Sequence, residues 1–296
     1  MTTIAMTGAT GLVGIHTLAA LLERTDVERV IVLGRDQPTT PLRERLETLL
    51  ITQGLGHALA GIDGMVAINS HLDQPMLGLE DVDIAALAAA DVLLNIAGHT
   101  TFLKDKRSAE MVQRVNVDGV DNLLAVASRL SLSRLVHVSS AYSSGAVDGH
   151  IAPDLALDDG FFPNPYQRSK FVGEQRVLAW GTAHHVPVIV ARPSTVGGRL
   201  IGEPLGAVTK YDVFLGWAKA LKRLKRVLGE ATADGRRHVP VRLALHPDAG
   251  LNIVPVDFAG PALAWLAADS PSHSAYHLAA PNAVRHTDYV AQMLDP

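Results

Sequence analysis

One glycine-rich segment, Thr7–Gly14 with the sequence TGATGLVG, constrains the fold of this chain more than any other stretch. A short apolar run precedes it at Thr3–Met6, and apolar residues at helical spacing follow it over Ile15–Leu22. A strand, a glycine turn and a helix are therefore predicted in succession. In that setting the three glycines permit a sharp turn, a close approach to a pyrophosphate, and tight packing of the helix on the strand.

The phosphates of such a ligand would bind to free N–H groups at the N-terminus of the helix. An ordinary glycine-rich loop before a helix is the alternative, and the flanking strand and helix make it the less favoured one. The residues of this segment that we expect to bind a dinucleotide are Thr7, Gly8, Thr10, Gly11, Leu12, Val13 and Gly14.

Apolar, strand-like runs alternate with helical patterns through the first two thirds of the chain. The strands predicted after the first are Val27–Leu33, Met65–Asn69, Asp91–Ile96, Arg134–Ser139 and Val186–Val190. The helices predicted between them are Leu42–Leu50, Asp81–Ala89, Ala109–Arg129 and Tyr166–Trp180. This alternation predicts an α/β fold with a doubly wound parallel (Rossmann) sheet, in which ligands bind at the carboxyl ends of the strands.

The alternation breaks down beyond Thr195, so two parts are predicted: a Rossmann domain over residues 1–195 and a smaller substrate lobe over residues 196–296. The elements expected in the second part are helices at Tyr211–Leu228 and Asp257–Ala268 and strands at Leu251–Val254 and Ala275–Leu278. Residues 251–268 are expected to pack back on the Rossmann core.

Composition excludes several classes of function. A chain of 296 residues can bury a sizeable core, and its net charge of −4 argues against binding to nucleic acid. The absence of cysteine rules out disulfides, thiolate metal sites and a cysteine nucleophile. The most apolar run, Ile84–Gly98, is short and interrupted by Asp91, so no membrane span is predicted. Because the chain enters its first strand directly after Met1, without a basic leader, a cytoplasmic location is expected.

The segment Gly34-Arg35-Asp36, at the end of the second predicted strand, bears on the choice between NAD and NADP. A carboxylate there would hold the ribose 2′-hydroxyl of NAD, whereas an arginine accommodates the 2′-phosphate of NADP. Gly34 with Arg35 favours NADP(H). Asp36 is the counter-argument, because a shift of one residue would place its carboxylate on the ribose. A solvated loop cation is the other interpretation of Arg35.

Ser140, Tyr166 and Lys170 are the predicted catalytic residues. Tyr166 and Lys170 are four residues apart on one predicted helix, so their side chains project from the same face. A nearby ammonium would lower the pKa of the phenol, and Ser140 could hydrogen-bond a carbonyl oxygen. The set suits hydride transfer from a nicotinamide, with a proton from Tyr166 and an oxyanion stabilised by Ser140. A partly buried tyrosine beside a surface lysine is the alternative for this spacing.

Together these motifs resemble the extended short-chain dehydrogenase/reductase superfamily over nearly the whole chain. The motifs that carry the resemblance are the glycine segment, Asn95-Ile96-Ala97-Gly98, Ser140, Tyr166-x-x-x-Lys170 and Arg192-Pro193. Further phrases resemble its branch of thioester reductases and fatty-acyl reductases: Leu33-Gly34-Arg35, Pro75-Met76-Leu77-Gly78-Leu79, His99-Thr100-Thr101-Phe102, Ser139-Ser140-Ala141-Tyr142, Ile253-Val254-Pro255-Val256-Asp257 and Tyr276-His277-Leu278.

The resemblance implies an NADPH-dependent reduction of an acyl thioester, on coenzyme A or phosphopantetheine, through a hemithioacetal that expels thiolate and leaves an aldehyde. It implies that Lys170 also holds the nicotinamide ribose. The further cofactor-binding residues that it implies are Arg35, His71, Leu72, Ala97, Gly98, Pro193, Ser194 and Val196. The residues that it implies on the substrate side are Phe102, Lys104, Ala141 and Tyr142. No metal is implied.

Two departures from the family pattern are visible. Ser70-His71-Leu72 stands where the family has Gly-Asp-Leu, which removes the usual acidic contact to adenine. The chain also stops at Pro296, where relatives often continue with more helices. A homodimer through the helices that carry Asn116 and Tyr166 is a further expectation from the superfamily.

Several residues keep two interpretations. The basic cluster Lys222–Arg226 is read as the solvated face of an amphipathic helix, with a contact to the phosphates of a carrier-bound substrate as the alternative. His99 is expected to be a polar wall residue rather than a base. For Asn116, a helix kink and the orientation of an active-site water both stay open.

Two other functions compete with thioester reduction. One is a nucleotide-sugar epimerase, dehydratase or ketone reductase of the same superfamily. The other is a non-catalytic NADP sensor, against which the joint presence of Tyr166 and Lys170 argues.

Overall fold

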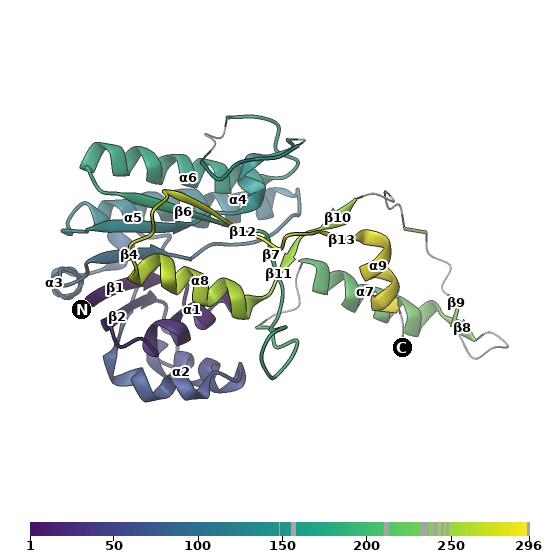
Figure 1. The fold of residues 1–296 in the computed structure, drawn as a ribbon, viewed down its shortest axis with the longest axis horizontal. Helices are drawn as coiled ribbons and strands as arrows, with labels where there is room; N and C mark the ends of the chain where they lie inside the picture. Colours follow the sequence, from purple (N-terminus) through teal and green to yellow (C-terminus); the bar gives the residue numbers. More distant parts are fainter. Residues whose placement is uncertain are drawn as a thin grey trace.

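The computed structural model describes residues 1–147, 149–154, 158–209, 213–231, 237–238, 242–243, 246 and 249–294. The strands of its central sheet are β1 (Thr2–Thr7), β2 (Val27–Gly34), β3 (Met65–Asn69), β4 (Val92–Asn95), β5 (Arg134–Val138), β6 (Val188–Pro193) and β12 (Ala275–Leu278). They pair in parallel in the order β12-β6-β5-β4-β1-β2-β3 (Figure 1). The predicted Rossmann-type sheet is therefore confirmed.

Helices cover both faces of this sheet (Figure 1). One layer contains α1 (Leu12–Leu22), α2 (Leu42–Thr52) and α8 (Val256–Ala268), and the other contains α3 (Asp81–Leu87), α5 (Gly119–Ala127) and α6 (Pro165–His184). Successive residues of β1 point into the two cores in turn, because side chains alternate along a strand. Ile4 and Met6 join the core under α1, and Ala5 joins the core under α5.

The predicted helix Ala109–Arg129 differs in detail from the observed one. The helical run begins earlier, with α4 (Lys106–Gln113), because the Asp105 carboxylate caps it by accepting from the Ser108 N–H. A π turn, η3 (Arg114–Asp118), then joins it to α5. Short 3-10 turns complete this half of the chain: η1 (Gly56–Gly64), η2 (Pro75–Gly78) and η4 (Ala141–Ser144).

The strand predicted at Val186–Val190 begins two residues later and reaches Pro193. The first predicted residue, Val186, instead belongs to the C-terminal cap of α6. Its N–H donates to the Gly181 carbonyl after His185, which has a left-handed backbone conformation.

α8 packs directly against α1, and small residues allow the approach. A Cβ on Gly260 would lie 2.6 Å from the Cβ of His16. The helix starts at Val256, after Pro255 in the N-cap position. Asp257 lies near that cap, in the first turn of the helix, and its carboxylate accepts from the backbone N–H groups of Ile201 and Gly202, both at 2.8 Å. The division of the chain into two lobes stays a prediction.

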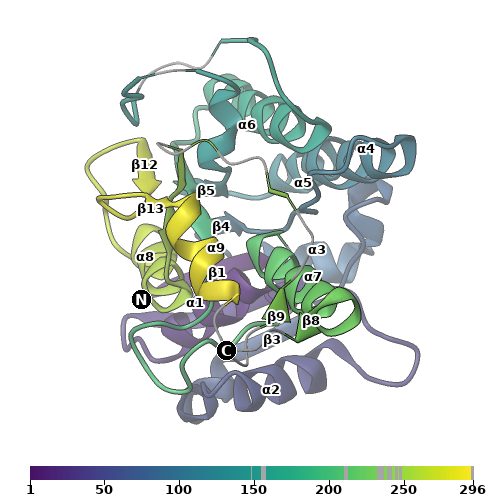
Figure 2. The same cartoon turned by 90° about the vertical axis from the view of Figure 1, so that its right-hand side faces the viewer.

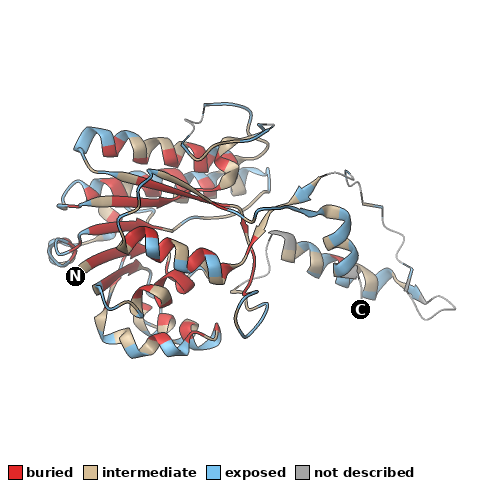
Figure 3. Cartoon of the chain, in the orientation of Figure 1, coloured by how far each residue is buried: buried red, intermediate tan, exposed pale blue. Residues whose placement is uncertain are grey.

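α7 (Val213–Leu228) and α9 (His286–Leu294) pack on each other beyond the carboxyl ends of the strands (Figures 1 and 2). Both helices are mostly exposed or half-buried, in contrast to the buried sheet (Figure 3). The predicted first residue of the former helix, Tyr211, lies outside the described residues. Short strand pairs link this region: β7 (Thr195–Val196) with β11 (Ile253–Val254), β8 (Glu230–Ala231) with β9 (Arg237–His238), and β10 (Gly250–Leu251) with β13 (Val284–Arg285).

The run Leu251–Val254, predicted as one strand, is split at Asn252. The Asn252 side chain exchanges two hydrogen bonds with the backbone of Ala280, so the chain changes strand partner at that residue. Among the described residues, no helix combines the length and the apolar character that crossing a membrane requires.

Candidate active site

A cavity of about 810 Å³ lies at the carboxyl edge of the sheet. Its walls come from the turn between β1 and α1, from the residues after β2, β3, β4, β5 and β6, and from Thr209 and Leu215. Strand order reverses between β1 and β4, which is where an open parallel sheet leaves a crevice for a ligand.

The glycine turn forms one wall of this cavity. Gly8 has a φ of +78°, and a Cβ there would lie 2.6 Å from the Ala97 nitrogen. A Cβ on Gly14 would lie 2.0 Å from the Gly8 carbonyl oxygen, whereas one on Gly11 would meet nothing closer than 3.4 Å. Within the described part of the chain, no side chain caps α1 at Gly11, so its first N–H groups are free to hold an anion. These features fit the pyrophosphate of a dinucleotide.

Three polar side chains link the ends of neighbouring strands beneath the cavity. The Thr7 hydroxyl donates to the Asn95 amide oxygen at 2.7 Å and accepts from the Ala97 N–H. The Asn95 amide nitrogen lies 3.1 Å from Nδ1 of His137. Burial, together with the charge of Lys170, lowers the pKa of His137 to about 3, so this imidazole is neutral. These side-chain hydrogen bonds connect β1, β4 and β5 where the strands meet the cavity.

Tyr166 is buried in the cavity wall at the first turn of α6, with 7% of its surface exposed. Burial raises the pKa of its phenol, and hydrogen bonds with the side chains of Ser140 and Thr100 oppose that rise. The expectation of a lowered pKa was therefore wrong. Desolvation, which depends on packing, outweighs the polar neighbours.

Lys170 lies one turn further along the same helix and also lines the cavity. Its ammonium donates to the Val138 carbonyl at 3.0 Å. Burial lowers the pKa of Lys170 to about 8, against the opposing charge of Glu174. Gly98 leaves room for this amine, because a Cβ there would lie 3.1 Å from Nζ. The structure thus brings the three predicted catalytic residues to one end of the cavity.

Asn116, in the π turn, holds the segment that follows β4. Its amide oxygen accepts from the His99 N–H at 2.7 Å, and its amide nitrogen donates to the His99 carbonyl and to the Ser169 hydroxyl, both at 2.9 Å. Of the two interpretations, the association with a helix irregularity agrees with the π turn. The contacts also make Asn116 a support for the cavity wall at His99.

Arg35 lines the opposite end of the cavity and is exposed. Asp36 is not among the described residues that line it. Its carboxylate accepts from the Leu42 N–H at 2.6 Å at the start of α2, and its own N–H donates to the Asn69 side chain. The register that would place this acid in the cavity is therefore not the one observed.

Aromatic rings line the cavity beside Tyr166. The Phe102 ring packs edge-on against Tyr142 and Tyr166, with ring centroids 5.5 and 5.3 Å apart. The Tyr142 hydroxyl lies 3.0 Å from the Thr195 hydroxyl. This end of the cavity therefore combines an apolar wall with the polar groups of Tyr166 and Ser140.

Most of the predicted binding residues line this cavity. The ones that do are Thr7, Gly8, Thr10, Gly11, Leu12, Val13, Gly14, Arg35, Leu72, Ala97, Gly98, Phe102, Tyr142, Pro193, Ser194 and Val196. Among the described residues, His71, Lys104 and Ala141 do not contribute to its lining. The segment after β3 turns through left-handed Met76 and Leu77, and the His71 N–H donates to the Leu77 carbonyl.

Sequence reasoning missed other residues that line the cavity. They include Ser70, Asp73, Met111, Arg114, Thr209 and Leu215. Asp73 and Arg114 carry opposite charges near one another, which a search of both segments for complementary charge could have found. No comparable signal marks Thr209 and Leu215, which follow the region where the strand-helix alternation ends.

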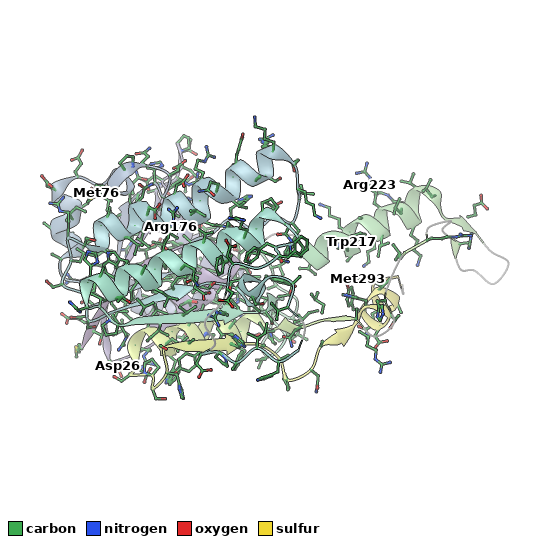
Figure 4. The ribbon with its side chains drawn as sticks, turned by 90° about the horizontal axis from the view of Figure 1, so that it is seen from above. Asp26, Met76, Arg176, Trp217, Arg223 and Met293 are labelled. Atoms are coloured by element: carbon green, nitrogen blue, oxygen red, sulfur yellow. The ribbon has the colours of Figure 1, made fainter. Side chains whose placement is uncertain are left out.

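The basic cluster lies on α7, outside the sheet. Figure 4 labels Trp217 and Arg223 on this helix and Met293 on α9. Leu221 is buried, whereas Lys222 and Arg223 are exposed, as an amphipathic helix requires. Trp217 on the same helix is 61% exposed. Among the described residues, no group of histidines and acids is arranged to hold a metal ion.

Comparison with known proteins agrees with this geometry. The family model described as male sterility protein, an NAD-binding family, matches residues 6–262. The nonribosomal peptide synthetase asaC of Aspergillus flavus is 29% identical over 220 residues, which cover 71% of this chain and 21% of that protein. This chain thus spans about a fifth of the relative's length.

Solved structures share the fold. The terminal R domain of the myxalamid PKS-NRPS pathway superposes with a TM-score of 0.77 at 27% identity, covering 99% of this chain and 69% of that one. The UDP-glucuronic acid 4-epimerase of Bacillus cereus has a TM-score of 0.70 at 17% identity, covering 98% and 82%, which is a likeness of fold alone. With the glycine turn and the tyrosine-lysine pair in one cavity, the chain belongs to the male sterility protein family, in the thioester-reductase branch of the extended short-chain dehydrogenases/reductases.

Proposed function

We propose that this chain uses NADPH to reduce an acyl thioester, carried on coenzyme A or on a phosphopantetheine arm, to an aldehyde. The observation that carries the proposal is the presence of Ser140, Tyr166 and Lys170 at one end of a cavity whose other wall is the glycine turn. The thioester-reductase branch supports the substrate class, and the similarity to a peptide synthetase supports a carrier-bound acyl group.

NADPH, when bound, supplies the hydride. Two observations favour it over NADH. The exposed guanidinium of Arg35 at the cavity wall suits a 2′-phosphate, and the Asp36 carboxylate is already occupied by the Leu42 N–H.

The protein's part in the reaction is to polarise and protonate the substrate carbonyl. The oxygen of the substrate carbonyl accepts hydrogen bonds from the hydroxyl groups of Tyr166 and Ser140. Because burial raises the pKa of Tyr166, the phenol keeps its proton at neutral pH and acts as the donor. As hydride adds to the carbonyl carbon, the oxygen takes the phenol proton and a hemithioacetal forms. The C–S bond then breaks, sulfur leaves as thiolate, and the hydroxyl proton is lost as the aldehyde forms.

Lys170 stabilises the phenolate that this proton transfer leaves behind. With a pKa of about 8 it is mostly protonated at neutral pH, and it lies one helical turn from Tyr166. Its contact with the Val138 carbonyl fixes the direction of the side chain, so its other two protons remain for the cavity.

The test is NADPH oxidation with a panel of acyl-coenzyme A and acyl-carrier thioesters, with the aldehyde product identified. We expect turnover with at least one thioester and a lower KM for the carrier-bound form. Absence of turnover with every thioester, together with conversion of a sugar nucleotide or a ketone, would overturn the proposal in favour of the other reactions of the superfamily.

A further inference from the structure

A buried ion pair lies directly behind the candidate catalytic residues. Glu174 is on α6, four residues beyond Lys170 and eight beyond Tyr166, and its side chain is 0% exposed. Arg192, near the end of β6, is 5% exposed and donates to both carboxylate oxygens of Glu174. Nη2 lies 2.6 Å from Oε1, and Nε lies 3.2 Å from Oε2.

The same carboxylate reaches the segment that carries Ser140. The Ser143 hydroxyl lies 3.1 Å from Oε2 of Glu174 and 2.8 Å from the Ser140 carbonyl oxygen, so its single proton is shared between the two acceptors. Ser143 itself is fully buried. The position of Ser140 therefore depends on Glu174 through one hydroxyl.

Arg192 extends the network in two further directions. It directly precedes Pro193, which lines the cavity, and its Nη1 donates to the Pro153 carbonyl at 3.0 Å. One carboxylate thus connects α6, η4, β6 and the segment at residues 149–154.

Stability alone is a poor reason for such a pair. Desolvation of two charges often cancels their attraction, and apolar side chains of similar volume serve a core equally well. Here the pair instead joins α6 to the end of β6 and, through Ser143, to the turn that follows Ser140.

Charged groups from several elements face this network. Arg192 and Glu174 both influence His277 on β12. Glu174 and Lys170 interact along α6, and Lys170 in turn influences His137 on β5. Neutralising Glu174 therefore leaves Lys170 with fewer compensating charges.

We propose that Glu174 is the positioning residue of the active site, which sets the spacing of Ser140 from Tyr166 and Lys170 through Ser143 and Arg192. The inference rests on the proposed reductase function, but one of its tests does not need turnover. It concerns a residue that contacts neither substrate nor cofactor and acts through its neighbours.

The first experiment compares Ser143→Ala with Ser144→Ala. Both serines donate to the carbonyl three residues earlier, but only Ser143 also contacts Glu174. We expect Ser143→Ala to lower kcat with the best thioester about tenfold to a hundredfold, at unchanged KM for NADPH, because a small displacement of a reacting group has effects of that size. Ser144→Ala should stay within about twofold of the wild type.

The second experiment follows the titration of Lys170 by NMR of carbon-labelled lysine, in the wild type and in Glu174→Gln. The amide is isosteric but uncharged, so the pKa of Lys170 should fall below its value of about 8. Ser143→Ala, which keeps the charge, should leave it unchanged. Circular dichroism of each variant confirms folding, and Ser143→Ala still tests the proposal if Glu174→Gln does not fold.

Two results would overturn the inference: equal kinetics for Ser143→Ala and Ser144→Ala, or an unchanged Lys170 titration in folded Glu174→Gln. A wild type that reduces no thioester would defeat the proposed function instead, and the Lys170 titration would still decide whether Glu174 acts on the site.

Discussion

The two ends of the cavity are built from different parts of the polypeptide. At the end proposed to bind the nucleotide, the site is built from main-chain groups and from the absence of side chains. Gly8 and Gly14 let backbone approach backbone, and the residues at the start of α1, whose N–H groups have no side-chain cap, line the cavity. At the other end, the groups proposed to react are buried side chains: Tyr166 and Lys170 from α6, and Ser140 from the turn after β5.

The difference teaches what each end tolerates. A backbone site is fixed by local conformation, so it fails when a Cβ no longer fits. A side-chain site is fixed by long-range packing and by charges taken out of water, so it fails when a functional group or its support is lost. Substitutions at one end should therefore change binding or stability, and those at the other should change turnover.

The largest effect is expected for Tyr166→Phe. Loss of the donated proton should lower kcat about 100- to 10,000-fold, while the ring keeps its packing against Phe102 and NADPH still binds. Steady-state kinetics and NADPH fluorescence titration measure the two quantities. Unchanged turnover would contradict the assignment of the donor, and an unchanged biological effect without turnover would favour the sensor hypothesis.

Gly14→Ala should break the nucleotide end. Its Cβ would lie 2.0 Å from the Gly8 oxygen, and overpacking of this kind costs about 1–3 kcal/mol of stability. Gly11→Ala is the matched control, because φ −83° and ψ 166° suit alanine and its nearest contact is 3.4 Å. Thermal unfolding should therefore show a lower melting temperature for Gly14→Ala than for Gly11→Ala. Gly11→Ala should weaken only NADPH binding. Equal melting temperatures would show that close backbone packing does not define this end.

Arg35→Ala should sharpen the distinction within the nucleotide end. A charge-assisted bond to a 2′-phosphate contributes about 1.5 kcal/mol, so NADPH affinity should fall roughly tenfold. NADH, which lacks that phosphate, serves as the internal control and should bind equally to both proteins. Parallel losses for the two cofactors would remove Arg35 from the specificity contact. Isothermal titration calorimetry measures both affinities.

The smallest effect is expected from a change of pH, which should act on the end of the cavity that contains Lys170. Turnover should fall as pH rises through about 8, because the Lys170 ammonium is lost there, and Lys170→Arg should move that limb upward. The contribution of Lys170 to the free energy of unfolding changes with pH in the opposite direction. The folded-state pKa of Lys170 lies below the ordinary lysine pKa of 10.5, so the unfolded chain binds more protons between about pH 8 and 10.5. The contribution of Lys170 to stability therefore rises with pH over that window. Lys170→Met should lack the rise in denaturant titrations.

Several elements in both halves of the chain followed well from local patterns. Strand Met65–Asn69 and strand Ala275–Leu278 were predicted with the observed bounds, because alternation and continuous apolar runs are properties of neighbouring residues. Element boundaries differed from the predicted ones where a side chain bonds the backbone. Asp105 caps α4 by accepting from the N–H of Ser108, and Asn252, between β10 and β11, donates to the carbonyl of Ala280, 28 residues away.

The candidate site was predictable in part for the same reason. Tyr166 and Lys170 share a helix face by their spacing alone. Nothing local announced that the Asp36 carboxylate would be occupied by α2, that Asp257 would hold residues 200–202, or that Glu174 would meet Arg192.

The sequence by itself determined the glycine turn, the alternation of strands and helices along the first two thirds of the chain, and the residue types that meet at the carboxyl ends of the strands. Only the tertiary structure decided the electrostatic state of those residues, including the raised pKa of Tyr166 and the lowered pKa of Lys170. The reason is physical: conformation is largely set by neighbours along the chain, whereas desolvation is set by whatever packs against a group in space.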